Sequence, residues 1–184
     1  MRYLFILMMV VCFLGCVPYA DSPLTDAGVQ PIDAKLLGSW YWKDESDSGY
    51  IHIGLDKTSK ILRIMLVEFG KEGELTASEF TGHSSQLQGN SYLNLERVRP
   101  EDQEPGFLFV KYTLKPNALG ISLMDAGVVS KDIESGDLKG QVTKGEWTSN
   151  IHITASQEAL QAYILKQDKA LFSETSDLPR LNLP

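Results

Sequence analysis

The chain has 184 residues, of which 43% are hydrophobic and 22% charged, and this length and composition indicate one globular domain. The formal net charge of −7 argues against a protein that binds nucleic acid or an anionic lipid surface. Cys12 and Cys16 are the only cysteines. A domain that starts after them has no disulfide, so burial of its core must stabilise it.

Residues 1–15 have the pattern of a signal peptide. Residues 4–14 are apolar without interruption, and Arg2 supplies a positive charge in front of them. A helix that spans a bilayer needs roughly 20 apolar residues, whereas this run is shorter and Pro18 follows it closely. We therefore expect an export signal rather than a membrane-spanning helix.

The end of the apolar run, Phe13-Leu14-Gly15-Cys16, resembles the lipobox of bacterial lipoproteins. The resemblance implies that Cys16 is lipidated, becomes the mature N-terminus and anchors the protein in a membrane through its acyl chains. Val17 stands where inner-membrane retention signals often have Asp, which favours the periplasmic face of the outer membrane. Cleavage after Ala20 without lipidation is the alternative.

The segment from 16 to 32 is predicted to be the lipidated cysteine followed by a flexible tether. Pro18, Pro23, Gly28 and Pro31 interrupt any regular element there. Residues 33–172 are expected to form the domain, and residues 173–184 a mobile C-terminal tail.

Short strands separated by turn residues predict an all-β domain. A helical turn capped by Asp33 precedes the first strand, Gly38–Lys43, in which Trp40 and Trp42 share one face. Six more strands are expected at residues 50–55, 60–68, 74–82, 91–96, 107–114 and 119–124, with a polar loop at 84–90. A helix from Asp125 to Gly136 precedes an eighth strand at 150–154, and a closing helix follows it.

Sequential hairpins without long crossovers favour an eight-stranded up-and-down barrel, with one helix between strands seven and eight and one C-terminal helix. Gly38-Ser39-Trp40 at the start of the first strand resembles the G-x-W signature of lipocalins. In that family an Arg near the end of the last strand packs over the Trp, and no Arg follows His152 closely. The whole pattern also resembles small bacterial lipoproteins.

The lipocalin resemblance implies a ligand site inside the barrel. We expect Trp40, Trp42, Arg63 and Tyr112 to line it. Arg63 interrupts the apolar strand at 60–68 and allows two interpretations. It either points outward with its stem on neighbouring side chains, or points inward, where burial requires an anionic partner such as Glu79 or a ligand carboxylate.

The residues do not form a recognisable catalytic or metal site. His52 and His152 each lie between two isoleucines, so both face solvent if the isoleucines fill the core. No cysteine is left to complete a zinc site with them or with His83. No serine lies in a strand–elbow–helix motif. We predict no metal, no cofactor and no catalytic residue, and place a hydrolase third among the possible functions.

The expected function is therefore that of a non-catalytic lipoprotein in the bacterial envelope, anchored in the outer membrane and facing the periplasm. Its barrel would hold a small apolar or amphiphilic ligand. The alternative is an interaction or scaffold protein whose barrel is filled by its own side chains and whose surface binds another protein.

Overall fold

The computed structural model describes residues 17–44, 48–70, 73–98, 106–145 and 149–181. Strands and two α-helices make up most of these residues, so the fold is mostly β, as predicted. The predicted signal peptide and Cys16 lie outside the described residues. Within the described part, no helix has the length and apolar character that crossing a bilayer requires.

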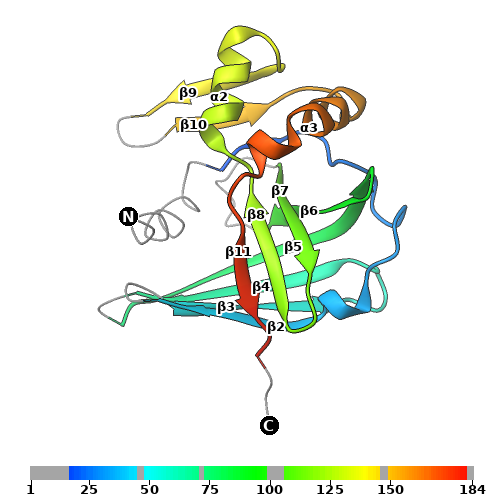
Figure 1. Cartoon of the computed structure of the whole chain (residues 1–184), viewed down its shortest axis with the longest axis vertical. Helices are drawn as coiled ribbons and strands as arrows, with labels where there is room; N and C mark the ends of the chain where they lie inside the picture. Colours follow the sequence, from blue (N-terminus) through cyan, green and yellow to red (C-terminus); the bar gives the residue numbers. More distant parts are fainter. Residues whose placement is uncertain (1–16, 45–47, 71–72, 99–105, 146–148, 182–184) are drawn as a thin grey trace.

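A meander of seven antiparallel strands forms the main part of the sheet (Figure 1). Each strand pairs with the next along the chain. The strands are β2 (Gly38–Lys43), β3 (Ser48–Leu55), β4 (Leu62–Phe69), β5 (Leu75–Leu87), β6 (Asn90–Arg97), β7 (Phe107–Leu114) and β8 (Ala118–Leu123). β5 is longer than predicted, because it continues to Leu87 and so includes the first four residues of the polar loop expected at 84–90.

The helices agree with the sequence patterns at their ends. A short 3-10 helix, η2 (Ala34–Leu36), precedes β2, and Asp33 caps it. α2 (Ala126–Ser135) begins after Asp125, whose carboxylate accepts the Val128 N–H at 3.0 Å, and ends at Gly136 with a left-handed φ of 86°. α3 (Gln157–Leu171) is the predicted closing helix. Between them lie β9 (Gly140–Lys144), which was not predicted, and β10 (Ser149–Ile153).

The complete sheet has eleven strands, and its ladders do not close into a barrel, so the predicted eight-stranded barrel is not confirmed. The predicted eighth strand, β10, pairs with β9 and with β1 (Tyr19–Ala20) instead of closing the meander. β11 (Ser176–Pro179) pairs with β8. Beyond β11, an isolated bridge joins Trp40 to Arg180, and the Leu181 N–H donates to the Ser39 carbonyl at 2.8 Å.

The apolar side chains gather in two cores. The first core lies inside the curved meander and includes Trp40, Leu62, Ile64, Leu66 and Tyr112. The second core lies between β6–β7 and the layer of α2, α3, β9 and β10 that Figure 1 shows above the meander. Consequently β6 and β7 are buried on both faces, whereas the far side of β2–β4 carries no helix of the described chain (Figure 1).

Both terminal segments differ from the prediction because they pack into these cores. Ala20 and Leu24 are fully buried, and the Leu24 N–H donates to Asn94 Oδ1 at 2.6 Å, so residues 17–32 are not a flexible tether. Leu178 in β11 is only 3% exposed, so the predicted mobile tail contributes a strand. The sequence missed both segments because each contributes only one or two core residues.

Candidate functional site

The two tryptophans predicted to line a ligand site belong to the first core. Trp40 is 1% exposed, and its Nε1–H donates to the Leu36 carbonyl at 3.1 Å. Trp42 packs against the same core. Leu62, Ile64 and Leu66 are also buried there. These side chains contact one another rather than an open apolar space.

Arg63 lies on the opposite side of β4 from this core. Its side chain is 55% exposed, and its Nε–H donates to Glu79 Oε1 at 2.9 Å on the neighbouring strand. The prediction that Arg63 lines the interior is therefore wrong, and the alternative interpretation of an outward Arg is confirmed. Glu79 is its partner, as suggested, but at the surface.

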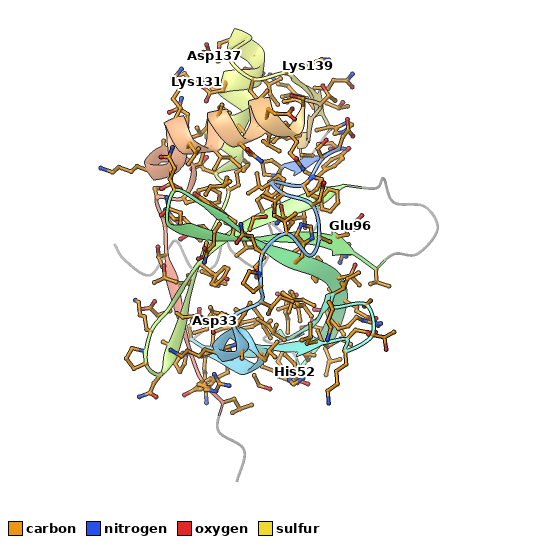
Figure 2. The ribbon with its side chains drawn as sticks, turned by 90° about the vertical axis from the view of Figure 1, so that its right-hand side faces the viewer. Asp33, His52, Glu96, Lys131, Asp137 and Lys139 are labelled. Carbon is orange, nitrogen blue, oxygen red and sulfur yellow. The ribbon has the colours of Figure 1, made fainter. Side chains whose placement is uncertain are left out.

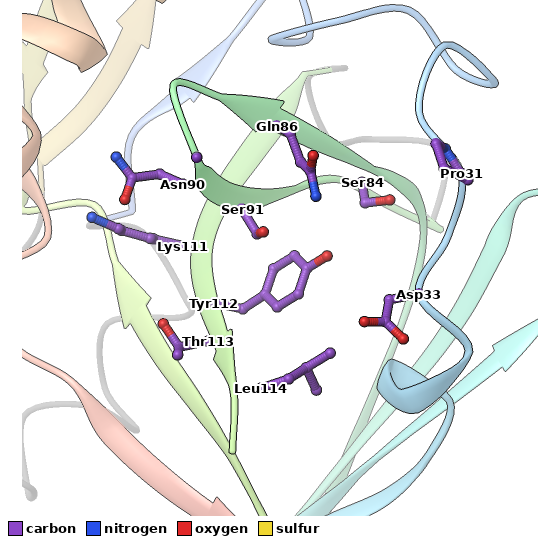
Figure 3. A pocket seen from close by; sticks show the side chains of 11 residues that line it. Pro31, Asp33, Ser84, Gln86, Asn90, Ser91, Lys111, Tyr112, Thr113 and Leu114 are labelled. Atoms are coloured by element: carbon purple, nitrogen blue, oxygen red, sulfur yellow. The ribbon is translucent and has the colours of Figure 1, made fainter. Parts of the chain in front are cut away.

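Of the four predicted lining residues, Tyr112 alone lines the polar cavity that the described residues form beside η2. Its side chain is 7% exposed and stands at the wall of a polar cavity of about 230 Å³ (Figure 3). The cavity lies between the segment that precedes η2 and the ends of β5, β6 and β7. Its lining residues are Pro31, Asp33, Ser84, Gln86, Gly89, Asn90, Ser91, Lys111, Tyr112, Thr113 and Leu114.

Polar groups in this cavity are incompletely paired. Ser84 is 3% exposed, and its hydroxyl has no hydrogen-bond partner of standard geometry among the described residues, although it lies near the Tyr112 hydroxyl. Burial raises the pKa of Tyr112 above its ordinary value of 10.0, and the charge of Asp33 adds to this shift. Asp33 Oδ1 also accepts the Lys35 N–H at 2.8 Å.

A charged pair closes one side of the cavity. Lys111 Nζ lies 2.5 Å from Asp168 Oδ2, and Asp168 Oδ1 accepts the Tyr92 hydroxyl at 2.6 Å. The ammonium of Lys111 is thereby matched by a carboxylate from α3. Asp33 is the only carboxylate among the described lining residues, and it has no ion pair with Lys111, which is bound to Asp168 instead.

A second candidate surface lies on the outward side of β2–β5, which we call the outer face. Its apolar side chains are Tyr41, Tyr50, Met65, Val67, Phe69, Leu75 and Ala77. Tyr41, Tyr50, Val67 and Ala77 are directly paired in one row across four strands. Phe69 is paired with Leu75 in a neighbouring row.

Several side chains of the outer face are open to solvent. Leu75 is 62% exposed, and Met65, Phe69 and Tyr41 are between 37% and 40% exposed. The rings of Tyr50 and Phe69 lie 6.5 Å apart, so the two rows meet between β3 and β4. The ion pair of Arg63 with Glu79 lies on this side of the same two strands, β4 and β5.

The histidines have separate partners. His52 points outward, away from the α2 layer (Figure 2), and its Nδ1 lies 2.9 Å from Ser39 Oγ. His83 is buried and lies 2.6 Å from the Thr25 carbonyl. His152 pairs with Asp21 at 2.6 Å and stacks on Tyr19 at 4.6 Å. Nowhere in the described ranges do three or more His, Cys, Asp or Glu residues group as metal ligands.

Of the eleven lining residues, sequence reasoning identified only Tyr112, and it missed Ser84 and Gln86 because they fell in a predicted loop. The available signal was the lack of Gly or Pro between Ser84 and Leu87, which allows β5 to continue. In the strand, Ser84 and Gln86 share one face toward the cavity.

Comparison of the chain with protein-family models, with curated proteins and with solved structures finds no match in any of the three.

Proposed function

We propose that the chain is a non-catalytic lipoprotein of the bacterial envelope that binds another envelope protein through its outer face. Acyl chains on Cys16 hold it in the outer membrane on the periplasmic side. The support for the anchor is the lipobox-like Phe13–Cys16 after an apolar run of signal-peptide length. Pro18 and Ala20 are already packed in the domain, so the anchor leaves it little room to move away from the membrane.

We further propose that β2–β8 and β11 form a lipocalin-like, incompletely hydrogen-bonded eight-stranded barrel. Three features support this proposal. Gly38-Ser39-Trp40 begins β2, α3 packs outside the meander, and the Trp40–Arg180 bridge brings the end of β11 to β2. In this arrangement β11 from the C-terminal segment takes the place that the sequence pattern gave to β10.

A filled interior favours an interaction protein over a carrier of an apolar ligand. An eight-stranded barrel either fills with side chains or holds one small ligand. The residues expected to surround that ligand, Trp40, Leu62, Ile64 and Leu66, are buried against one another. The expected apolar ligand would have to displace them, which costs several kcal/mol by disruption of core packing.

The observation that carries the proposal is the set of exposed apolar side chains on the outer face, Tyr41, Met65, Phe69 and Leu75. Val67, between Met65 and Phe69 on the same side of β4, is itself buried. Contiguous exposed apolar surface rimmed by polar groups marks protein interaction sites. Tyr41 and Tyr50 supply aromatic rings of the kind enriched in such interfaces, and Leu75 and Phe69 extend the patch.

Site-specific photocrosslinking in cells tests this function. A benzophenone amino acid at Met65, on the outer face, is expected to give a discrete adduct with a different envelope protein. The control is the same amino acid at Val29, which is 61% exposed but lies outside the outer face. Adducts of the same pattern from both positions, none from Met65, or adducts only with a second copy of the chain would contradict the proposal.

The anchor has a separate test. Labelled palmitate is expected to appear in the wild-type protein and to disappear in Cys16→Ser. Retention of label in Cys16→Ser would exclude lipidation at that residue, whatever the crosslinking shows.

A further inference from the structure

We propose that the polar cavity beside Tyr112 binds one uncharged sugar ring, either as a free sugar or as a residue of a glycan. This site is independent of the outer face, because it is built from the segment before η2 and the ends of β5–β7. The proposal goes beyond protein binding and does not require a partner protein.

The first argument is the buried hydroxyl of Ser84. A buried polar group without a hydrogen bond destabilises a fold, so such groups are rare. Ser84 is 3% exposed, borders the cavity, and has no partner of standard geometry in the described chain. The Ser84 oxygen is sealed beneath the cavity wall beside the Tyr112 hydroxyl, so its side chain would rotate toward the cavity to hydrogen-bond a ligand hydroxyl.

The second argument is the chemistry of the other lining groups. Hydroxyls and amides supply both donors and acceptors without charge, as recognition of several ligand hydroxyls requires. These groups come from Ser84, Ser91, Tyr112, Thr113, Gln86 and Asn90. The Tyr112 hydroxyl is protonated at neutral pH, as that of an ordinary tyrosine is, so it can donate to a ligand oxygen.

Charge excludes an anionic ligand. Lys111, the only cation among the described lining residues, is paired with Asp168. The carboxylate of Asp33 points into the cavity (Figure 3), and its negative charge would repel an anion there. Its carboxylate is a strong acceptor for sugar hydroxyls.

Size and shape limit the ligand to about one ring. The cavity of about 230 Å³ is smaller than the roughly 300–1,000 Å³ of sites for drug-sized molecules. The ring of Tyr112 stands in the middle of the cavity wall, with Leu114 beside it (Figure 3). These two side chains offer an apolar surface to the C–H groups of a sugar, while the polar groups surround its hydroxyls.

Titration of the full chain with sugars tests the proposal. The protein is labelled with ¹⁵N and held in a detergent without a sugar head group, such as lauryldimethylamine oxide. Glucose and N-acetylglucosamine are the free-sugar probes, chitotriose is the glycan probe, and choline is the cationic comparison. We expect saturable amide shifts centred on Ser84, Ser91 and Tyr112 with the sugars. Tighter binding of chitotriose would identify a glycan residue as the ligand, and tighter binding of the monomers a free sugar.

Two variants separate ligand binding from folding. Ser84→Ala is expected to weaken sugar binding about three- to tenfold, the effect of one lost hydrogen bond. Urea denaturation without sugar measures separately how much the Ser84 hydroxyl, which lies near that of Tyr112, stabilises the fold. Tyr112→Phe is expected to weaken binding by a similar factor. Tyr41→Phe makes the same chemical change on the outer face and should leave binding unchanged.

Three results would overturn the proposal. They are shifts that do not saturate or lie away from the cavity, unchanged affinity in both Ser84→Ala and Tyr112→Phe, and binding of choline that is tighter than that of every sugar.

Discussion

Arg180 lies over Trp40, with its guanidinium carbon 4.7 Å from the centre of the indole ring. The same guanidinium donates to the Leu37 carbonyl at 2.6 Å and to the Lys35 carbonyl at 3.1 Å. The two residues are also joined by the backbone bridge between the end of β11 and β2. Arg180 therefore connects the C-terminal segment, the first strand and the helical turn before it.

Removal of this guanidinium should cost more stability than removal of an ordinary surface Arg. Arg180→Ala loses a cation–π contact and two charged hydrogen bonds, and we expect it to lower the free energy of unfolding by about 2–4 kcal/mol. Arg63→Ala, which breaks an exposed ion pair, should cost less than about 1 kcal/mol. Urea denaturation measures both, and equal losses would show that Arg180 does not hold the segments together.

The sequence predicted the meander well but not the element that completes it. The bounds that hydrophobic alternation predicts for β2 and β7 are the ones observed. β11 has a single buried residue, Leu178, and includes Pro179, so no local pattern distinguishes it from a tail. It is a strand because β8 pairs with it across more than fifty residues of chain. For the same reason, the Arg that packs over Trp40 is at position 180 and not after His152, where the lipocalin resemblance predicts it.

The buried position of Leu178 yields a prediction for the segment expected to be mobile. Leu178→Ala should lower the free energy of unfolding by about 2–4 kcal/mol, because it leaves a cavity in the first core. Leu181→Ala is the matched control, since Leu181 is 36% exposed, and should cost less than about 1 kcal/mol. Thermal unfolding followed by circular dichroism compares the variants, and an unaffected midpoint in Leu178→Ala would mean that β11 is not part of the stable fold.

The candidate site was predictable only in part, for a geometric reason. Tyr112 was identified from its aromatic character, and it does border the cavity. Sequence alternation assigned Trp40 and Trp42 to one face, but whether space remains beside them depends on how the strands curve together. The cavity itself forms where Asp33 approaches Ser84 from another part of the chain, and no local pattern encodes that approach.

Amide hydrogen exchange tests the packing of the N-terminal segment. The Leu24 N–H is buried and bonded to Asn94 Oδ1, so it should exchange only through larger opening events, unlike an amide in a flexible tether. Asn94→Ala should accelerate its exchange and destabilise the protein by about 1–3 kcal/mol, because a buried N–H loses its acceptor. The amide of exposed Val29 serves as an internal reference. Equally fast exchange at Leu24 and Val29 in the wild type would contradict the packing.

The free energy of unfolding should depend on alkaline pH because of two buried tyrosines, Tyr92 and Tyr163. Burial, and then hydrogen bonds to Asp168 and Asp132, raise the pKa of Tyr92 and Tyr163 above the ordinary value of 10.0. Above that pH the unfolded chain loses these protons before the folded protein does. The folded state then binds more protons, so the free energy of unfolding must fall as pH rises above about 10, by up to about 1.4 kcal/mol per pH unit for each tyrosine.

Tyr163→Phe isolates this effect. Its hydroxyl donates to Asp132 Oδ2 at 2.9 Å, so the variant should be less stable at neutral pH yet lose stability less steeply between pH 10 and 11. Tyr41→Phe, at an exposed position, should retain the wild-type slope. Urea denaturation at several pH values measures the slopes. If the free energy of unfolding of Tyr163→Phe falls with pH as steeply as that of the wild type, the Tyr163 hydroxyl has the same pKa in the folded and unfolded states. The buried hydrogen bond to Asp132 would then contribute nothing to the loss of stability at alkaline pH.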